Sequence, residues 1–290
     1  MTTPANAEIY DQGYRVYDGP RTGVGTAVRS VFAISVQRAL GLRRKFRFKI
    51  IPVLTIFISF VPALVFLGVS VLFPAELVGE LVDFSGYFGL TGVATVLFTA
   101  FVTPELLISD RQSGMFGIYM ASPLNRRSYL LAKFQAIFAV INFVTLLPVV
   151  FLLIGYLAVG IGPEGISEIS STALRIVLSG TAVALFYSVI GMAIATLTNK
   201  AGVGSAVVIM TFLASAFLAN ALVDAADAPF WVQAFSLSQL PMDIAARIFD
   251  EPANQLFEVS TATSVAVFVA TLCLSMLIIA WGYRRIEVTK

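Results

Sequence analysis

The side chains best suited to binding or catalysis gather in one stretch, residues 104–133, between the apolar runs 87–103 and 134–158. A polar stretch between two runs of membrane-spanning length predicts a turn at the membrane surface, here on the cytoplasmic side. The candidates are charged, aromatic or turn-forming residues: Glu105, Asp110, Arg111, Gly114, Met115, Phe116, Tyr119, Pro123 and Arg126. Side chains of these types at a basic, aromatic turn predict a docking surface.

The same stretch contains signals for two helices. A short amphipathic piece is predicted over about 110–120. Ser122 followed by Pro123 predicts a new helix that begins at Pro123, because a serine hydroxyl accepts an unpaired N–H and proline has no N–H to leave unpaired. We expect this second helix to carry Arg126 and Lys133 before it enters the bilayer.

The chain lacks the residues that most catalytic mechanisms require. Histidine is absent, and Cys273 is the single cysteine, so a disulfide within the chain and a thiol metal cluster are excluded. No phosphate-binding Gly-x-x-x-x-Gly-Lys sequence occurs. The interiors of the predicted spans contain no charged residue, since Glu105 and Arg175 lie at span ends. This absence argues against an ion-driven carrier, which needs a buried charge. We therefore expect no catalytic residue, metal or bound cofactor, and no nucleic-acid partner.

The composition predicts an integral membrane protein. The chain has 290 residues, of which 58% are hydrophobic and 12% charged, and its mean hydropathy is +0.88. An all-α domain over 49–285 is expected to contain six apolar runs long enough to cross a bilayer. These runs are 50–73, 87–108, 134–158, 174–198, 201–223 and 261–283.

Basic residues set the expected orientation. Seventeen of the nineteen Lys and Arg residues fall in segments on one side, and only Arg175 and Arg247 fall on the other. By the positive-inside rule, both termini are cytoplasmic, including the tail 286–290. No cleavable signal peptide is expected.

Two segments precede the first span. Residues 1–26 predict a cytoplasmic arm that packs on a partner or folds back on its own membrane domain. Residues 27–48 predict an amphipathic helix in the plane of the interface, with Val31 and Ser35 on its apolar side and Arg38 opposite, toward the lipid head groups.

Two further sets of residues suggest roles in a transport pathway. The candidates to line the pathway are polar, uncharged side chains within the spans and one aromatic neighbour: Thr91, Thr95, Phe98, Thr99 and Asn142. Their alternative role is helix packing. The segment 224–260 predicts two short helices, broken at Pro241, that lie on or dip into the outer leaflet. Its aromatic residues Trp231 and Phe235 are candidate surface anchors.

The ordered residues of 104–133 resemble the signature of type-2 ABC exporter permeases. The matching positions are Pro104-Glu105-Leu106-Leu107, Asp110-Arg111, Gly114, Tyr119, Pro123-Leu124-Asn125-Arg126 and Tyr129-Leu130-Leu131-Ala132-Lys133. In that family the turn is the coupling helix, which contacts a separate ATPase subunit, and the segment equivalent to 27–48 is a connecting helix. The resemblance implies that Met115, Phe116 and Tyr119 fill a cleft on the ATPase, while Glu105, Asp110 and Arg111 fix the angle of the turn.

The resemblance therefore implies a permease subunit that forms the substrate pathway as a dimer with a second copy or homologue. ATP and Mg²⁺ would be bound by the partner ATPase, and the substrate would be an amphipathic small molecule, lipid or peptide. The expected location is the cell membrane, as a multi-pass protein of a prokaryote. The alternatives are a membrane scaffold or sensor that recruits a cytosolic protein through the same turn and, more remotely, a membrane enzyme.

Overall fold

The computed structural model describes residue 19 and residues 23–42, 46–73, 83–226, 228–251, 256–257 and 259–285. Every regular element in these ranges is a helix, as the composition predicts. Most of the predicted arm 1–26 and the tail 286–290 lie outside the described residues.

Six helical spans confirm the predicted number of membrane crossings. They are Lys49–Leu72 in α2 (Arg47–Leu72), α4 (Gly86–Gln112), α6 with α7 (Arg126–Val159), α8 (Gly165–Leu197), α9 (Ala201–Ala226) and α11 (Thr261–Arg285). Several are longer than the apolar runs that predicted them. For example, α8 has 33 residues, whereas a crossing needs about 20. A helix continues beyond the hydrocarbon wherever backbone hydrogen bonding continues, so hydropathy underestimates its length.

The third span consists of two helices, α6 (Arg126–Thr145) and α7 (Leu147–Val159). Pro148 lies at the first turn of α7, where its missing N–H leaves no hydrogen bond unmade. The break falls within a continuous apolar run, so hydropathy alone treats the two helices as one.

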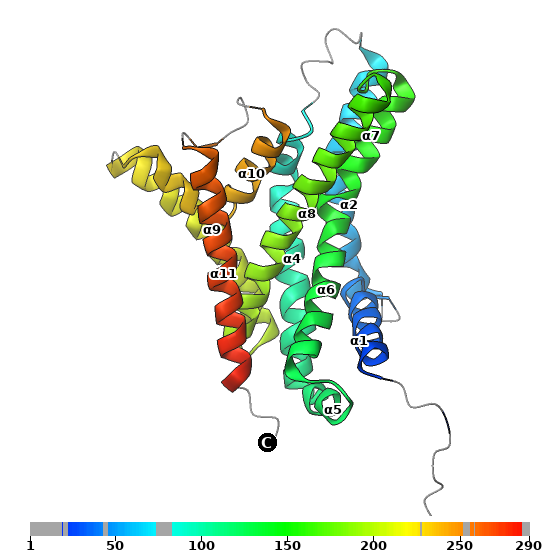
Figure 1. Cartoon of the computed structure of the whole chain (residues 1–290), viewed down its shortest axis with the longest axis vertical. Coiled ribbons are helices and arrows are strands. Elements are labelled where there is room, and N and C mark those ends of the chain that lie inside the picture. The colour runs from blue at the N-terminus through cyan, green and yellow to red at the C-terminus, as the bar shows by residue number, and fades with distance from the viewer. Residues whose placement is uncertain are drawn as a thin grey trace, which may run out of the picture.

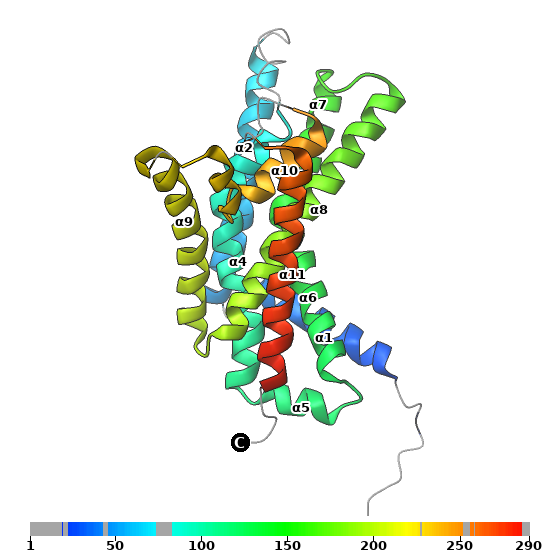
Figure 2. The ribbon, with the colours of Figure 1, turned by 60° about the vertical axis from the view of Figure 1, so that its left-hand side comes forward.

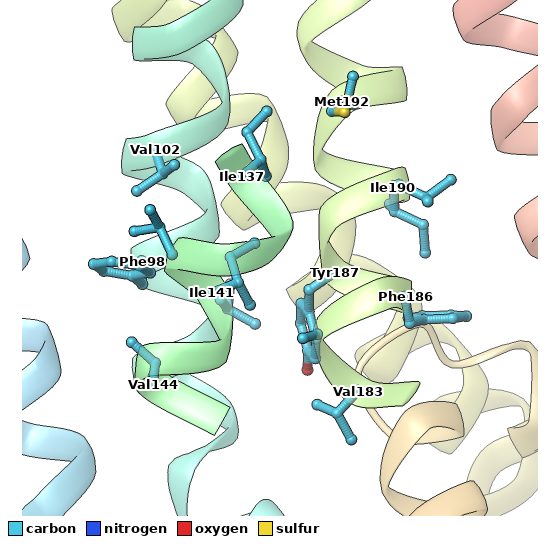
Figure 3. Packing of buried hydrophobic residues seen from close by; sticks show 14 of the residues in the cluster. Phe98, Val102, Ile137, Ile141, Val144, Val183, Phe186, Tyr187, Ile190 and Met192 are labelled. Carbon is cyan, nitrogen blue, oxygen red and sulfur yellow. The ribbon is translucent and has the colours of Figure 1, made fainter. Parts of the chain in front are cut away.

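The buried core lies between α4, α6 and α8, which cross side by side (Figures 1 and 3). Phe98 and Val102 of α4, Ile137 and Ile141 of α6, and Tyr187 of α8 are all fully buried there. In contrast, α2, α9 and α11 bury only a small part of their apolar surface within the chain. Their outer faces are suited to lipid or to another membrane subunit.

Close contact between α4 and α8 depends on Gly191. A Cβ at this position would lie 2.7 Å from Cγ2 of Thr99 and 2.8 Å from Cγ2 of Thr103, both on α4. Small residues that allow helix backbones to approach are typical of packed membrane helices. Gly191 therefore has a packing role between α4 and α8.

The threonine stripe of α4 packs in this core as well. Thr91, Thr95 and Thr99 are at most 2% exposed, and each hydroxyl donates to a carbonyl one turn earlier in its own helix. Phe98 is also buried, and the Asn142 amide donates to the Phe138 carbonyl at 2.8 Å. These contacts show the three threonines and Phe98 in helix packing, because the hydroxyls are satisfied within the helix and covered by neighbours; a pathway-lining role for the five residues stays a prediction.

The amphipathic helix is shorter than predicted and turned differently. It is α1 (Val24–Ala39) rather than 27–48, and Gly41, at φ 68°, lies in the turn that follows it. Val31 and Ser35, which were predicted on its apolar side, are buried against the bundle. Arg38 also faces the bundle rather than the lipid head groups, which corrects its predicted orientation.

Beyond the end of α9 at Ala226, the described residues of the segment 224–260 include two short helices, as predicted. These are the 3-10 helix η1 (Phe230–Phe235) and α10 (Leu240–Phe249), which packs against α8 (Figure 2). Pro241 is buried in the first turn of α10, so it begins the second helix instead of breaking the segment. Trp231 and Phe235 are more than half exposed and contact each other edge-on, with ring centroids 6.1 Å apart.

Candidate functional site

The predicted docking turn is a compact structure at one end of the bundle, near α1 and the C-terminal end of α11 (Figures 1 and 2). After α4 ends at Gln112, Gly114 adopts a φ of 71°, and α5 (Met115–Ala121) follows. This left-handed conformation suits glycine and lets the chain reverse within two residues.

The start of α6 differs from the prediction. Asn125, rather than Ser122, caps the helix: its side chain accepts from the backbone N–H of Ser128, and the Ser128 hydroxyl accepts from the N–H of Asn125. Ser122 instead donates its hydroxyl to the Tyr119 carbonyl and closes the end of α5. Pro123 consequently lies in the exposed turn before α6.

Four charged side chains form an ionic cluster above this turn. Asp110 of α4 is fully buried, and it pairs with Arg38 of α1 and Lys133 of α6, each at 2.7 Å. Arg38 also reaches Glu105 at 3.2 Å. Two acidic and two basic side chains thus balance, which is the condition under which buried charges are tolerated.

Neutral donors complete the coordination of the ionic cluster. The Tyr129 hydroxyl donates to Oδ2 of Asp110 at 3.1 Å, and Nζ of Lys133 donates to the Ser35 hydroxyl at 2.9 Å. Since Asp110, Lys133 and Ser35 come from α4, α6 and α1, the ionic cluster joins three helices at one point.

An aromatic cluster of Phe116, Tyr119, Tyr129 and Tyr283 holds α5 against the bundle. The ring of Phe116 lies edge-on to Tyr129, with centroids 5.2 Å apart, and contacts Tyr283 of α11 at 6.1 Å. Phe116 is only 4% exposed, which corrects the expectation that it fills a cleft on a partner. Phe116 is therefore buried by rings of its own chain, those of Tyr129 and Tyr283.

Tyr119 lies at the edge of the aromatic cluster and is half-buried. Burial raises the pKa of its phenol, the Asp110 carboxylate raises it further, and Arg38 opposes this shift. Its ring also lies 5.8 Å from the Lys133 ammonium. Tyr119 therefore stays neutral and contributes an aromatic surface rather than a charge.

Two arginines join the turn to the ends of other spans. Arg111 donates to the carbonyls of Ala195, Thr196 and Thr198, where α8 ends, and Arg126 donates to the carbonyls of Tyr283 and Arg284 in α11. A cation at a helix C-terminus stabilises the unpaired carbonyls and the negative end of the helix dipole. The turn is consequently attached to four helices: α4, α6, α8 and α11.

These attachments divide the predicted residues into two groups. Glu105, Asp110, Arg111, Phe116 and Arg126 contact the bundle, whereas the outer surface of the turn is formed by exposed Gly114 and Pro123 and by half-buried Met115 and Tyr119. Ile118, which was not among the predicted residues, is 63% exposed on α5.

Sequence reasoning missed three residues of this site: Ser35, Arg38 and Tyr283. The spacing of Ser35 and Arg38, three residues apart in a helix, is a usable signal because it places both at one edge of the buried side. Tyr283 has no such signal, since its contact with α5 joins segments more than 150 residues apart.

Gly114 provides a local test of this geometry. Gly114→Val is expected to destabilise the protein by about 1–2 kcal/mol, because a branched side chain disfavours the left-handed conformation. Gly114→Asn should cost less, since asparagine tolerates that conformation and a Cβ at Gly114 meets nothing within 4 Å. Denaturant titration in detergent micelles measures both variants. Equal losses would contradict a role for backbone conformation here.

The chain has six helices that are long and apolar enough to cross a membrane, and the turn between α4 and α6 is attached to the bundle. The molecule is therefore a multi-pass membrane protein. The family model described as ABC-2 type transporter matches residues 29–240, and the chain belongs to that family. The family comprises membrane components of transporters and implies association with ABC ATPases. No curated protein matches the chain.

Proposed function

We propose that this chain is the permease subunit of an ATP-driven ABC exporter, and that α5 is the coupling helix through which a separate ATPase acts on the spans. The observation that carries the proposal is the attachment of α5 and its flanking turns to α4, α6, α8 and α11 through Phe116, Arg111 and Arg126. A surface fixed to four helices can transmit a displacement to all of them, whereas a loosely tethered loop would absorb it.

The ATPase, with its ATP and Mg²⁺, is assigned to a partner. The sequence contains no phosphate-binding Gly-x-x-x-x-Gly-Lys sequence, and the family associates with ABC ATPases. In this proposal the ATPase contacts the outer surface of the turn, centred on Ile118, with Met115 and Tyr119 beside it. An exposed apolar residue with aromatic neighbours is suited to the centre of an interface.

The substrate pathway is assigned to the interface between two permease copies or homologues in a prokaryotic cell membrane, with α5 and both termini in the cytoplasm. The packed core of one protomer leaves its outer apolar faces, such as those of α9 and α11, for this association. The transported molecule is proposed to be amphipathic: a small molecule, a lipid or a peptide.

Ile118→Asp tests the docking surface. Placing a carboxylate at the centre of an apolar contact is expected to weaken capture of the ATPase at least tenfold, a change of about 1.4 kcal/mol. The measurement is the Mg²⁺-dependent ATPase activity that co-purifies with the tagged chain from its native membrane. Ile166→Asp is the matched control, because Ile166 is also exposed but lies at the opposite end of the bundle. Undiminished capture by correctly folded Ile118→Asp would contradict the proposed surface.

A further inference from the structure

A pocket of about 500 Å³ opens at the end of the bundle opposite α5. Its walls come from α4, α8 and α9 and from the η1–α10 segment, and they include Gly89, Tyr187, Phe212, Gln239 and Met242. The volume is in the range of pockets that bind small molecules. The threonines of α4 that were predicted to line a pathway do not contribute to this pocket.

Two residues that line the pocket have a buried polar atom with no hydrogen-bond partner among the described residues: the hydroxyl of Tyr187 and Oε1 of Gln239. Tyr187 is fully buried, and its ring stacks on Phe212 with centroids 4.8 Å apart. Figure 3 shows the Tyr187 ring on the side of α8 that faces α4, away from Phe186. Leaving a buried polar group unpaired is unfavourable, so two such groups at one pocket indicate a missing partner.

The walls also restrict the charge of that partner. Among the described residues that line the pocket, the other side chains are aliphatic, aromatic, methionine, glycine or serine, and none is charged. A formal charge inside the pocket would lose its hydration without gaining a counter-ion. The Tyr187 phenol can donate a hydrogen bond and the Gln239 amide oxygen can accept one. A ligand hydroxyl can accept from the first and donate to the second, so a hydroxyl is the favoured partner.

Gly89 shows that part of the pocket is open at the backbone of α4. A Cβ at this position would have no heavy atom within 4 Å, although Gly89 lies inside a helix. Glycine is also less favourable than alanine inside a helix. A larger residue at position 89 can therefore fill the pocket without disturbing the packing around it.

We propose that this pocket binds an uncharged, mostly apolar molecule through a hydroxyl group that pairs with Tyr187 and Gln239. Its apolar part contacts Phe212 and Met242. Binding is a property of the chain alone; the identification of this molecule with the transported substrate rests on the proposed function. A neutral lipid with a free hydroxyl and a compact apolar alcohol share this chemistry.

Photolabelling of the purified chain, without any ATPase, tests the site. The probe is a long-chain alcohol that carries a diazirine, compared with its methyl ether and with the carboxylate of the same length. The alcohol is expected to label the pocket saturably and at least tenfold more tightly than either analogue. Labelling elsewhere, or equal affinity of the alcohol and the ether, would overturn the proposal.

Variants separate the hydrogen bonds from the pocket volume. Tyr187→Phe and Gln239→Leu should each weaken labelling about tenfold without lowering the thermal stability of the empty chain, because the atoms they remove have no partner there. Gly89→Leu should abolish labelling by filling the pocket. The matched controls are Ser179→Ala, which removes another unpartnered hydroxyl of α8, and Gly68→Leu, which adds the same volume on α2. Unchanged labelling of Gly89→Leu would exclude this site.

Competition identifies the source of the ligand. Displacement of the probe by diacylglycerol in the surrounding nanodisc would assign the pocket to a lipid, and displacement only by a compact aromatic alcohol would assign it to a solute. Displacement by neither would overturn the proposal. Because the assay contains no ATPase, its failure would leave the proposed transport function unaffected.

Discussion

Asp110→Ala is expected to destabilise the protein by about 3–5 kcal/mol, the largest effect of any single substitution considered for this chain. The substitution leaves the ammonium of Lys133 buried without its carboxylate, and it removes the closest partner of Arg38. The loss should appear as poor accumulation in the membrane and as a reduced free energy of unfolding in detergent.

Glu105→Ala is the matched control, because Glu105 is a partly exposed carboxylate that also pairs with Arg38, at 3.2 Å rather than 2.7 Å. Its cost should remain within about 1 kcal/mol. Lys133→Met in the Asp110→Ala background should recover much of the lost stability, since it removes the unpaired charge. If the double variant were no more stable than Asp110→Ala, the ionic cluster would not be the cause of the loss.

Arg111→Ala is expected to cost about 2–3 kcal/mol and to loosen the end of α8. Three carbonyls at this helix terminus lose the Arg111 donor at once, and the turn before α9 loses its hydrogen bond from Arg111 to the Thr198 carbonyl. Hydrogen exchange of the amides in α8 and α9 should increase near this turn, which distinguishes local loosening from global unfolding.

Two variants bracket this prediction. Arg111→Lys retains the charge but offers fewer donors in a fixed geometry, so it should retain part of the stability. Gln112→Ala removes one exposed hydrogen bond to the Asn199 carbonyl and should change stability by about 0.5 kcal/mol. A loss for Arg111→Ala no larger than that for Gln112→Ala would contradict its role at the end of α8.

The spans could be predicted because each requires only an uninterrupted apolar run of sufficient length. The division of 224–260 into two short helices followed for a related reason, since its apolar residues were too many for a hydrated loop. Helix ends were less predictable. Ser122 and Asn125 are both capping residues by type, and only the geometry of the chain shows that Asn125 caps α6.

The candidate site was predictable in position but not in its contacts. Phe116 and Ile118 are both apolar residues of α5, yet Phe116 contacts Tyr283 while Ile118 is exposed, because α11 passes on one side only. Arg38 was assigned to the head groups, since a helical pattern gives the relative orientation of side chains without showing which neighbour each side faces. The threonines of α4 were ambiguous because a hydroxyl bonded to its own helix leaves no trace in sequence.

The most direct test of the proposed function is purification of the tagged chain from its native membrane, followed by assay of ATP hydrolysis before and after stringent washing. An ABC ATPase should co-purify, and its activity should be lost when washing removes it, leaving a chain that hydrolyses no ATP. Hydrolysis by the washed chain alone, or the absence of any ATPase from the gently purified chain, would contradict a permease driven by a separate subunit.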